Sequence, residues 1–353
     1  MTTALPPAIA AAFAQQADFC RLFAAPFTAA MCEATALAFD ATSASGRAII
    51  DWPGDAFADA LMMRVTGGFN ALVRAGQAPE LAGLYPPAAL PLVAQLATAA
   101  RAVLADPVRD AALLGWLAGP PQTNEVARSG VLFPGLMAVA AATRLPLRLF
   151  ELGCSAGLNL NLDRFGYALG GISAGDPLSP VQLAPVWTGP PPPPADVTLV
   201  SRRGIDINPL DVAEAATRER LMAYVWPDQP ERVARAQAAI ALARRQPPAI
   251  DGGDAAAWVE HHVVTDAGSV AVVMHSIAFQ YFPPATKARI AAHMARTGEM
   301  ASATAPLAWL RYEMDDASVA QLPTLRLTLW QGGLPTEHLL ARAHSHGTFV
   351  QWL

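Results

Sequence analysis

The chain has 353 residues, 53% of them hydrophobic, and a formal net charge of -5. A chain of this length can bury one large core, or one large and one smaller domain. The excess of acidic over basic residues excludes the basic surface typical of nucleic-acid-binding proteins, so the expected partner is a small molecule and not a nucleic acid.

The three cysteines, Cys20, Cys32 and Cys154, are odd in number and lack metal-ligand spacing. This pattern favours reduced thiols over a disulfide framework. No stretch approaches the roughly 20 uninterrupted apolar residues of a membrane span. The N-terminal stretch has no Lys or Arg before its apolar residues, unlike a signal peptide. We therefore expect a cytoplasmic protein without a membrane segment.

The first third of the chain has helical patterns. Apolar residues recur at helical spacing from Ile9 to Phe23 and again from Phe57 to Leu72. A third apolar helix is expected over about residues 88–104. No strand pattern interrupts this region, so residues 1–120 are predicted to form an all-helical N-terminal domain.

A polar segment, Gln122 to Arg128, follows Gly119-Pro120-Pro121 and resembles a helix start. One interpretation is a solvated, capped helix end. The other is that Asn124, Glu125 and Arg128, which share one face at helical spacing, overhang a ligand site formed later in the chain.

The stretch from Leu147 to Asp163 predicts a strand, a glycine turn and a helix. Apolar residues alternate up to Glu151, and small residues then occupy the positions from Gly153 to Gly157. This unit would place free backbone N–H groups and the positive end of a helix at the carboxyl end of a strand. An anionic or polar ligand group is favoured there.

Strand and helix patterns alternate through the rest of the chain. A proline-rich insertion at about 170–196 interrupts them, and its run of prolines is expected to be extended. Val270 to His275 is apolar up to its last residue, which is typical of a strand buried on both faces. A β-rich tail is expected from Leu325 onward. The order predicts a doubly wound α/β sheet within a second domain, residues 121–353.

Three acidic residues lie at or near successive strand ends: Glu151, Asp206 and Asp254. In open α/β sheets, ligands bind beyond the carboxyl ends of the strands, where the strand order reverses. A carboxylate there can accept hydrogen bonds from ribose hydroxyls or an adenine amino group. Each acid alone is more often a cap or a turn residue, but the three together with a glycine turn favour such a site.

The turn from Glu151 to Gly157 resembles the first motif of class I S-adenosylmethionine-dependent methyltransferases, in which an acidic residue precedes glycines at alternating positions. Six separated motifs also resemble an uncharacterised bacterial family, the domain of unknown function numbered 2332. They are Thr123 to Arg128, Glu151 to Asp163, Arg203 to Asp211, Trp226 to Arg232, Ala308 to Glu313 and His346 to Trp352.

The resemblance implies a Rossmann-like, methyltransferase-like fold, with a mostly parallel sheet and helices on both of its faces. It also implies S-adenosylmethionine as the cofactor. The methionine part would face the glycine turn, Asp206 would hold the ribose hydroxyls, and Asp254 would reach the adenine amino group. Ser155 stands where the middle glycine usually lies, so its side chain could crowd the cofactor. The implied cofactor-binding residues are Glu151, Gly153, Ser155, Gly157, Asp206 and Asp254.

Transfer of a sulfonium methyl group mainly requires alignment of the acceptor and exclusion of water. A general base helps only when the acceptor is protonated, and His275 or Glu125 could serve by predicted position. Asn124, Arg128 and Ser276 are expected to contact the small-molecule acceptor.

The residues Gly153-Cys-Ser-Ala-Gly157 also satisfy the G-x-S-x-G nucleophile elbow of α/β-hydrolases. Ser155 would then be the nucleophile, with Asp315 or Asp316 as the acid and His344 or His346 as the base. The helical N-terminal region, however, offers fewer parallel units before the serine than that fold requires. A third alternative is a methyltransferase-like fold that has lost catalysis and binds a nucleotide-like ligand or a protein.

The histidines do not predict a metal site. His261 and His262 are adjacent, so on a helix their side chains point about 100° apart and rarely reach one ion. His344 and His346 could share a strand face, but no cysteine or carboxylate cluster accompanies them.

Overall fold

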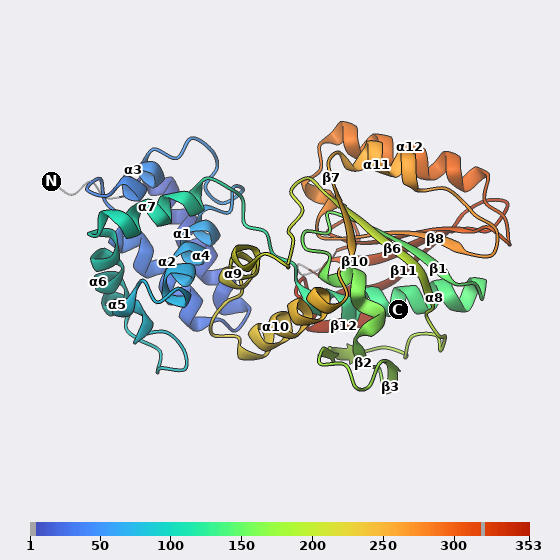
Figure 1. The fold of residues 1–353 in the computed structure, drawn as a ribbon, viewed down its shortest axis with the longest axis horizontal. Helices are drawn as coiled ribbons and strands as arrows, with labels where there is room; N and C mark the ends of the chain where they lie inside the picture. The colour runs from blue at the N-terminus through green and yellow to red at the C-terminus, as the bar shows by residue number, and fades with distance from the viewer. Residues whose placement is uncertain (1–4, 319–321) are drawn as a thin grey trace. The chain divides into compact units, whose positions relative to one another are not determined.

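The computed structural model describes residues 5–318 and 322–353. The chain divides into two compact units. One comprises Met1–Thr123 and Glu214–Gln237, and the other comprises Asn124–Ala213 and Ala238–Leu353. Figure 1 shows the fold and labels many of its elements.

The first unit is helical throughout the part that the structure describes, and Phe13, Met31 and Phe69 are among its fully buried side chains. The second predicted helix, whose apolar pattern starts at Phe57, begins only at Leu61, after a turn in which Ala60 has a φ of 52°. The helices are α1 (Pro7–Leu22), α2 (Pro26–Ala38), α3 (Ala44–Ile50), α4 (Leu61–Arg74), α5 (Pro79–Ala82), α6 (Val93–Leu104), α7 (Pro107–Leu117) and α9 (Ala215–Ala223).

Residues 214–237, which were predicted to lie in the second domain, instead pack within the first unit. Asn70 Nδ2 donates to the carbonyls of Ala223 and Val225, at 2.9 and 3.2 Å. The Asp228 carboxylate accepts from the backbone N–H of Phe27 at 2.8 Å, at the start of α2. Trp226 is buried in the same core. The boundaries predicted from the sequence therefore need this correction.

The second unit is built on a nine-stranded sheet of order β5-β12-β11-β10-β9-β8-β1-β6-β7 (Figure 1). The five strands from β9 to β7 pair in parallel, and β10 and β11 pair antiparallel with their neighbours. The strands are β1 (Leu147–Leu152), β5 (Val186–Thr188), β6 (Leu199–Asp206), β7 (Ala249–Gly252), β8 (Val270–Ser276), β9 (Leu307–Glu313), β10 (Thr324–Trp330), β11 (Thr336–Ala343) and β12 (Phe349–Trp352).

The strand order reverses between β1 and β8. From β1 the chain proceeds outward to β6 and β7, and then returns to form β8 and β9 on the other side of β1. The helices α11 (Ala255–His262) and α12 (Pro284–Glu299) cover one face of this sheet, and α8 (Ser129–Thr143) covers the other (Figure 1). Helix α10 (Pro230–Arg245) lies between β6 and β7 in the sequence. An α/β fold with a large, mostly parallel central sheet is confirmed.

The insertion predicted over about 170–196 forms a separate three-stranded sheet together with the residues just before it. Its strands are β2 (Gly166–Leu169), β3 (Ile172–Gly175) and β4 (Gln182–Leu183). The proline run that follows is anchored by Trp187, whose ring stacks on Trp352 at 5.7 Å and whose Nε1 donates to the Pro190 carbonyl at 3.0 Å.

One helical segment of the described chain, Val126–Thr143, is long and apolar enough to cross a membrane by length and composition alone. Of this segment, 72% is buried inside the fold. Its helix α8 packs on strands β9, β10 and β11, so its apolar character is that of a core helix.

Candidate functional site

The glycine turn predicted from the sequence lies at the carboxyl end of β1, beside the reversal of strand order. Gly153, Ser155 and Gly157 all have left-handed backbones, with φ of 67°, 56° and 64°. Glycine adopts this conformation freely, whereas a side chain makes it unfavourable. Ser155 therefore occupies a glycine-like position, as the motif implies.

The turn is held between the neighbouring strands. A Cβ added at Gly153 would lie 2.7 Å from the Ala278 Cβ, just after β8. One added at Gly157 would lie 2.8 Å from Cδ1 of Ile250 in β7. The two glycines are therefore required by close packing as well as by backbone conformation.

The backbone N–H groups of the turn already donate within the chain. Gly153 and Cys154 donate to the Ile205 carbonyl at 2.9 and 3.2 Å, and Ser155 donates to Asp206 Oδ2 at 2.7 Å. Gly157 donates to the Cys154 carbonyl at 2.7 Å. An anionic ligand cannot use these groups, so the free N–H groups expected from the sequence are not offered by these residues.

The helix predicted after the turn is a short 3-10 segment, η2 (Leu158–Arg164), with non-helical angles at Asn161. Its first N–H donates to Asn124 Oδ1 at 2.9 Å. The segment is therefore too short to form the expected anion site, and its first N–H group is already hydrogen-bonded.

The structure brings residues 124–129 against the turn. The Asn159 side chain donates to the Glu125 carbonyl at 3.3 Å and accepts from Ser129 Oγ at 2.8 Å. Glu125 is buried, and its Oε1 accepts from the backbone N–H of Ala127 at 3.1 Å, as the cap of η1 (Val126–Arg128). Glu125 is thus a helix cap, although it was predicted as a general base. Asn159 was not singled out from the sequence, since its only signal is its place in the Glu151 to Asp163 motif.

Arg128 links two loops at the carboxyl edge of the sheet. Its Nη1 donates to the Ser276 carbonyl at the end of β8, and its Nε donates to the Ser345 carbonyl before β12, both at 3.0 Å. Arg128 and Ser276, both predicted to bind substrate, are therefore joined to each other.

Glu151 is 3% exposed, and its Oε2 has no hydrogen-bond partner among the described residues. Burial raises the pKa of this carboxyl to about 8, and the negative charge of Asp206 adds to the rise. The positive charge of Arg128 opposes it. Glu151 is therefore mostly protonated at neutral pH.

Ser155 presents a second buried polar atom on the same turn. The residue is 7% exposed, and its Oγ also has no partner in the described structure. The Asp206 carboxylate lies beside both residues, because it accepts from Ser155 N and raises the pKa of Glu151. Its other oxygen accepts from Asn208 N at 2.9 Å.

Asp254, the third predicted acid, caps α11 by accepting from Ala257 N at 2.9 Å, and it pairs with Arg289 at 3.3 Å. The acid within β7 itself is Asp251, which the sequence analysis did not single out. Asp251 accepts from Trp258 Nε1 at 2.6 Å and pairs with Arg203, whose hydrogen bonds to the carboxylate hold the pKa of Asp251 below its usual value.

His275, predicted as a general base, is 1% exposed with both ring nitrogens engaged. Its Nε2 accepts from Trp309 Nε1 at 3.1 Å, and its Nδ1 lies 2.8 Å from Glu313 Oε1. Because an indole N–H only donates, Nε2 carries no proton, and Nδ1 donates to Glu313. The prediction of His275 as a base is therefore not supported by its contacts.

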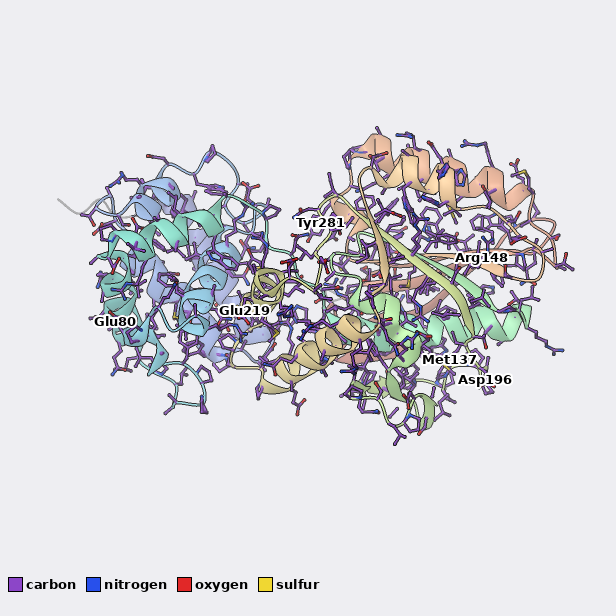
Figure 2. All side chains as sticks on the ribbon, in the orientation of Figure 1. Glu80, Met137, Arg148, Asp196, Glu219 and Tyr281 are labelled. Carbon is purple, nitrogen blue, oxygen red and sulfur yellow. The ribbon has the colours of Figure 1, made fainter. Side chains whose placement is uncertain are left out.

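Glu313 was not singled out individually from the sequence, although it closes the Ala308 to Glu313 motif. Its Oε1 also accepts from the N–H groups of Ala278 and Phe279, both at 3.0 Å. Burial acts to raise its pKa, but these amides and His275 outweigh burial and hold the pKa below its usual value. Glu313 thereby fixes the loop after β8, in which Ile277 has a φ of 48° and Tyr281 is 75% exposed (Figure 2).

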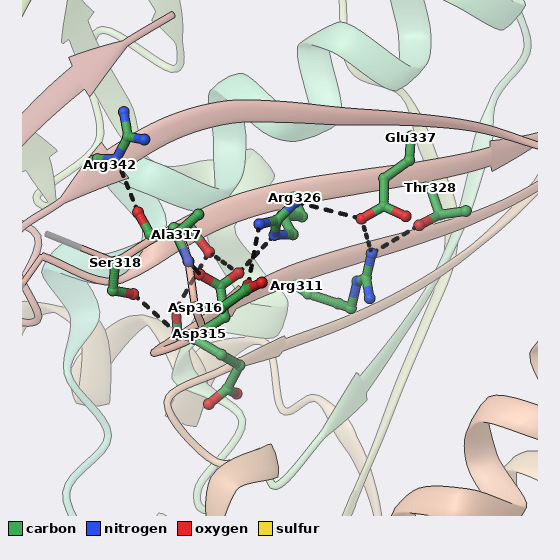
Figure 3. Close-up of polar contacts among 11 residues, drawn as sticks. Arg311, Asp315, Asp316, Ala317, Ser318, Arg326, Thr328, Glu337 and Arg342 are labelled. Carbon is green, nitrogen blue, oxygen red and sulfur yellow. Dashed lines mark hydrogen bonds and ion pairs between the residues drawn. The ribbon is translucent and has the colours of Figure 1, made fainter.

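Among the described residues, Ser155 does not form the hydrogen bond to a histidine that a serine-hydrolase triad requires. Ser155 Oγ has no partner among the described residues. Asp315 instead accepts from Arg326 Nε at 2.6 Å and from Thr324 Oγ1 at 2.5 Å, and Asp316 lies 3.6 Å from Arg326 (Figure 3). His344 Nδ1 accepts from the backbone N–H of His346 at 3.2 Å.

Comparison with known proteins identifies a family but no activity. The model of a family described as "Uncharacterized protein conserved in bacteria (DUF2332)" matches residues 10–352. No curated protein and no solved structure matches the chain. Within residues 5–318 and 322–353, no group of three or more His, Cys, Asp or Glu residues could hold a metal ion.

Proposed function

We propose that this chain, which belongs to the DUF2332 family, binds S-adenosylmethionine on a Rossmann-like, methyltransferase-like domain and transfers its methyl group to a small molecule. One observation carries the proposal. At the carboxyl end of β1, two buried polar atoms, Glu151 Oε2 and Ser155 Oγ, have no hydrogen-bond partner among the residues that the structure describes. Buried polar atoms in folded proteins are almost always hydrogen-bonded, so a pair of exceptions on one turn indicates a ligand.

The topology supports a ligand at this place. Strands β7, β6, β1, β8 and β9 are parallel, and their order reverses beside β1. In open sheets of this kind, the loops on the two sides of the reversal diverge and leave a crevice beyond the strand ends.

The chemistry of the turn favours a cationic ligand over a phosphate. The N–H groups that would hold a pyrophosphate are bonded within the chain, as described above. What the turn offers is a carboxyl group, a hydroxyl group and the adjacent Asp206. S-adenosylmethionine carries an ammonium group and a sulfonium, which suit such acceptors.

The remaining groups fit a nucleoside. Each Asp206 oxygen accepts one N–H and keeps a second lone pair for a ribose hydroxyl. The next residue, Ile207, is 89% exposed and provides apolar surface for a base. The cofactor, when bound, supplies an activated methyl group. The protein's part is to bind and orient the reactants, because His275 and Glu125 are engaged in structural hydrogen bonds.

Calorimetric titration of the full chain with S-adenosylmethionine and with S-adenosylhomocysteine tests the proposal. Both ligands are expected to bind, and Glu151→Gln is expected to weaken binding. Glu299→Gln, an exposed residue at the end of α12, is the matched control. If neither ligand binds and a serine-reactive phosphonate labels Ser155, the hydrolase alternative replaces the proposal.

Transfer of a labelled methyl group to the small-molecule fraction of a bacterial extract separates a methyltransferase from a non-catalytic member of the fold. Loss of the label in Glu151→Gln and retention in Glu299→Gln would assign the transfer to this site. Binding without any transfer would favour the non-catalytic alternative.

A further inference from the structure

Two of the three cysteines lie beside each other in the core of the first unit. Cys20 is in the last turn of α1 and Cys32 is in the middle of α2, and both are buried free thiols. A hydrogen bond joins their side chains. The residues that follow them in the sequence are also joined, because Arg21 forms an ion pair with Glu33. Two neighbouring contacts therefore hold these positions of α1 and α2 face to face.

The two sulfurs have different polar surroundings. The Cys32 thiol donates to Cys20 Sγ, and Gln16 Nε2 donates to the same sulfur at 3.5 Å. Both donors stabilise a thiolate, so they lower the pKa of Cys20 although burial acts to raise it. The hydrogen bond to Cys20 and burial both raise the pKa of Cys32. Cys20 is therefore the more reactive thiol, and Cys32 is a protonated thiol next to it.

The position of Cys20 favours access from solvent. It lies in the last turn of α1, and Gln16, one turn earlier, is only half-buried. Helix ends open locally at a much lower cost than the middle of a core helix. Cys154, in contrast, lies in the second unit, and burial raises its pKa well above the usual value. Cys20 and Cys32 are therefore the two thiols arranged to react together.

We infer that Cys20 and Cys32 form a redox modification site, at which a peroxide converts the two thiols into a reversible disulfide. The Cys20 thiolate attacks one oxygen of the peroxide, the O–O bond breaks, and Cys20 becomes a sulfenic acid. With hydrogen peroxide, the hydroxide that leaves takes up a proton and becomes water. The Cys32 thiol then attacks the Cys20 sulfur, the S–S bond forms, and a second water leaves. Two electrons pass from the sulfurs to the peroxide oxygens.

The disulfide would link α1 to α2 within the helical unit, and this site is independent of the proposed methyl transfer. A cross-link restricts the unfolded chain, so the oxidised protein is expected to melt at a higher temperature than the reduced protein. A reducing compartment returns the pair to thiols by thiol–disulfide exchange. Disulfides that form transiently in such compartments are usually catalytic or redox-sensing.

The test treats the full chain with hydrogen peroxide and maps the linked residues by mass spectrometry under non-reducing conditions. The expected product has a Cys20–Cys32 bridge, keeps Cys154 as a thiol, and returns to three thiols with dithiothreitol. Cys32→Ala lacks the second thiol, so it is expected to accumulate the sulfenic acid on Cys20, which dimedone traps. Cys20→Ala is expected to form neither the bridge nor a dimedone adduct.

The role of Gln16 is tested by the rate of bridge formation. Gln16→Ala is expected to slow it about two- to fivefold, because one hydrogen bond to the thiolate is lost and the remaining thiolate is slightly more nucleophilic. Gln15→Ala, its exposed neighbour in α1, is the matched control and is expected to keep the wild-type rate. Thermal melting of each reduced variant shows that it is folded.

Several results would overturn the inference. No bridge, or a bridge that includes Cys154, would show that the native fold does not pair Cys20 with Cys32. A bridge that forms only in urea, where the chain unfolds, would show the same. Equal rates for Gln16→Ala and Gln15→Ala would overturn the assignment of Cys20 as the attacking thiol.

Discussion

The indole Nε1 of Trp309 donates a hydrogen bond to Nε2 of His275 at 3.1 Å. Because the donor can only donate, this single contact fixes the histidine as the neutral tautomer that carries its proton on Nδ1. The proton then points at Glu313, which also holds the loop after β8 through two amides. His275 is therefore a structural link between strands β8 and β9.

Replacing His275 is expected to affect stability more than binding. His275→Ala leaves Glu313 and the Trp309 N–H without their partner in a buried site, which costs about 2–4 kcal/mol in the free energy of unfolding. Urea denaturation measures this loss. His261→Ala, on the exposed side of α11, is the control and should stay within about 0.5 kcal/mol of the wild type. If His275→Ala is as stable as the wild type but has lost all methyl transfer, His275 has a catalytic role.

Glu151 is expected to make the protein less stable as pH rises. Its pKa is about 8 in the folded chain against an ordinary value of 4.5. Between these values the folded state binds more protons than the unfolded state, so the free energy of unfolding falls as pH increases through this window. The full effect of this one residue is on the order of 5 kcal/mol above pH 8.

The variant Glu151→Gln isolates this effect, because it keeps the shape of the side chain and cannot ionise. Urea denaturation at pH 5, 7 and 8.5 should show the wild type losing stability relative to Glu151→Gln at each step. A constant difference between the two proteins across this range would mean that Glu151 has an ordinary pKa.

The parallel core of the sheet could be predicted from the sequence because its signals are local. The apolar run from Val270 and the alternation before Glu151 each lie within a few residues. The turn at Gly153 to Gly157 was found in the same way. These patterns report burial and backbone conformation, which short segments largely determine.

The long-range contacts of the fold and of the site could not be predicted, because they join residues far apart in the sequence. Asn70 donates a hydrogen bond to the carbonyl of Ala223, which is 153 positions away in the sequence. Residues 214–237 belong to the first unit. Glu313 meets His275 across 38 positions. Periodicity reports which residues are buried but not which partner each one meets, so His275 was assigned a catalytic role.

Ligand binding is expected to release a proton from Glu151. An ammonium group favours the ionised carboxylate, whereas the free protein holds this carboxyl mostly protonated at pH 7. Affinity for S-adenosylhomocysteine should therefore rise between pH 6 and 7.5, by at most about tenfold per pH unit. Calorimetry in buffers of different ionisation enthalpy counts the released protons directly. If Glu151→Gln and the wild type release the same number of protons on binding, the proton comes from another group.

Gly157 is expected to tolerate no side chain, and its replacement tests how rigidly the turn is held. Gly157→Ala places a Cβ 2.8 Å from Ile250 and forces alanine to a φ of 64°. Strain and overpacking together should cost at least ~2 kcal/mol in the free energy of unfolding.

Gly115→Ala is the matched control, since this exposed glycine in α7 has no atom within 4 Å of an added Cβ. It should gain about 0.5–1 kcal/mol, because alanine is the better helix former. Equal stability of the two variants would mean that the turn adapts to a side chain, and the fixed placement of Glu151 and Ser155 beside Asp206 would no longer follow.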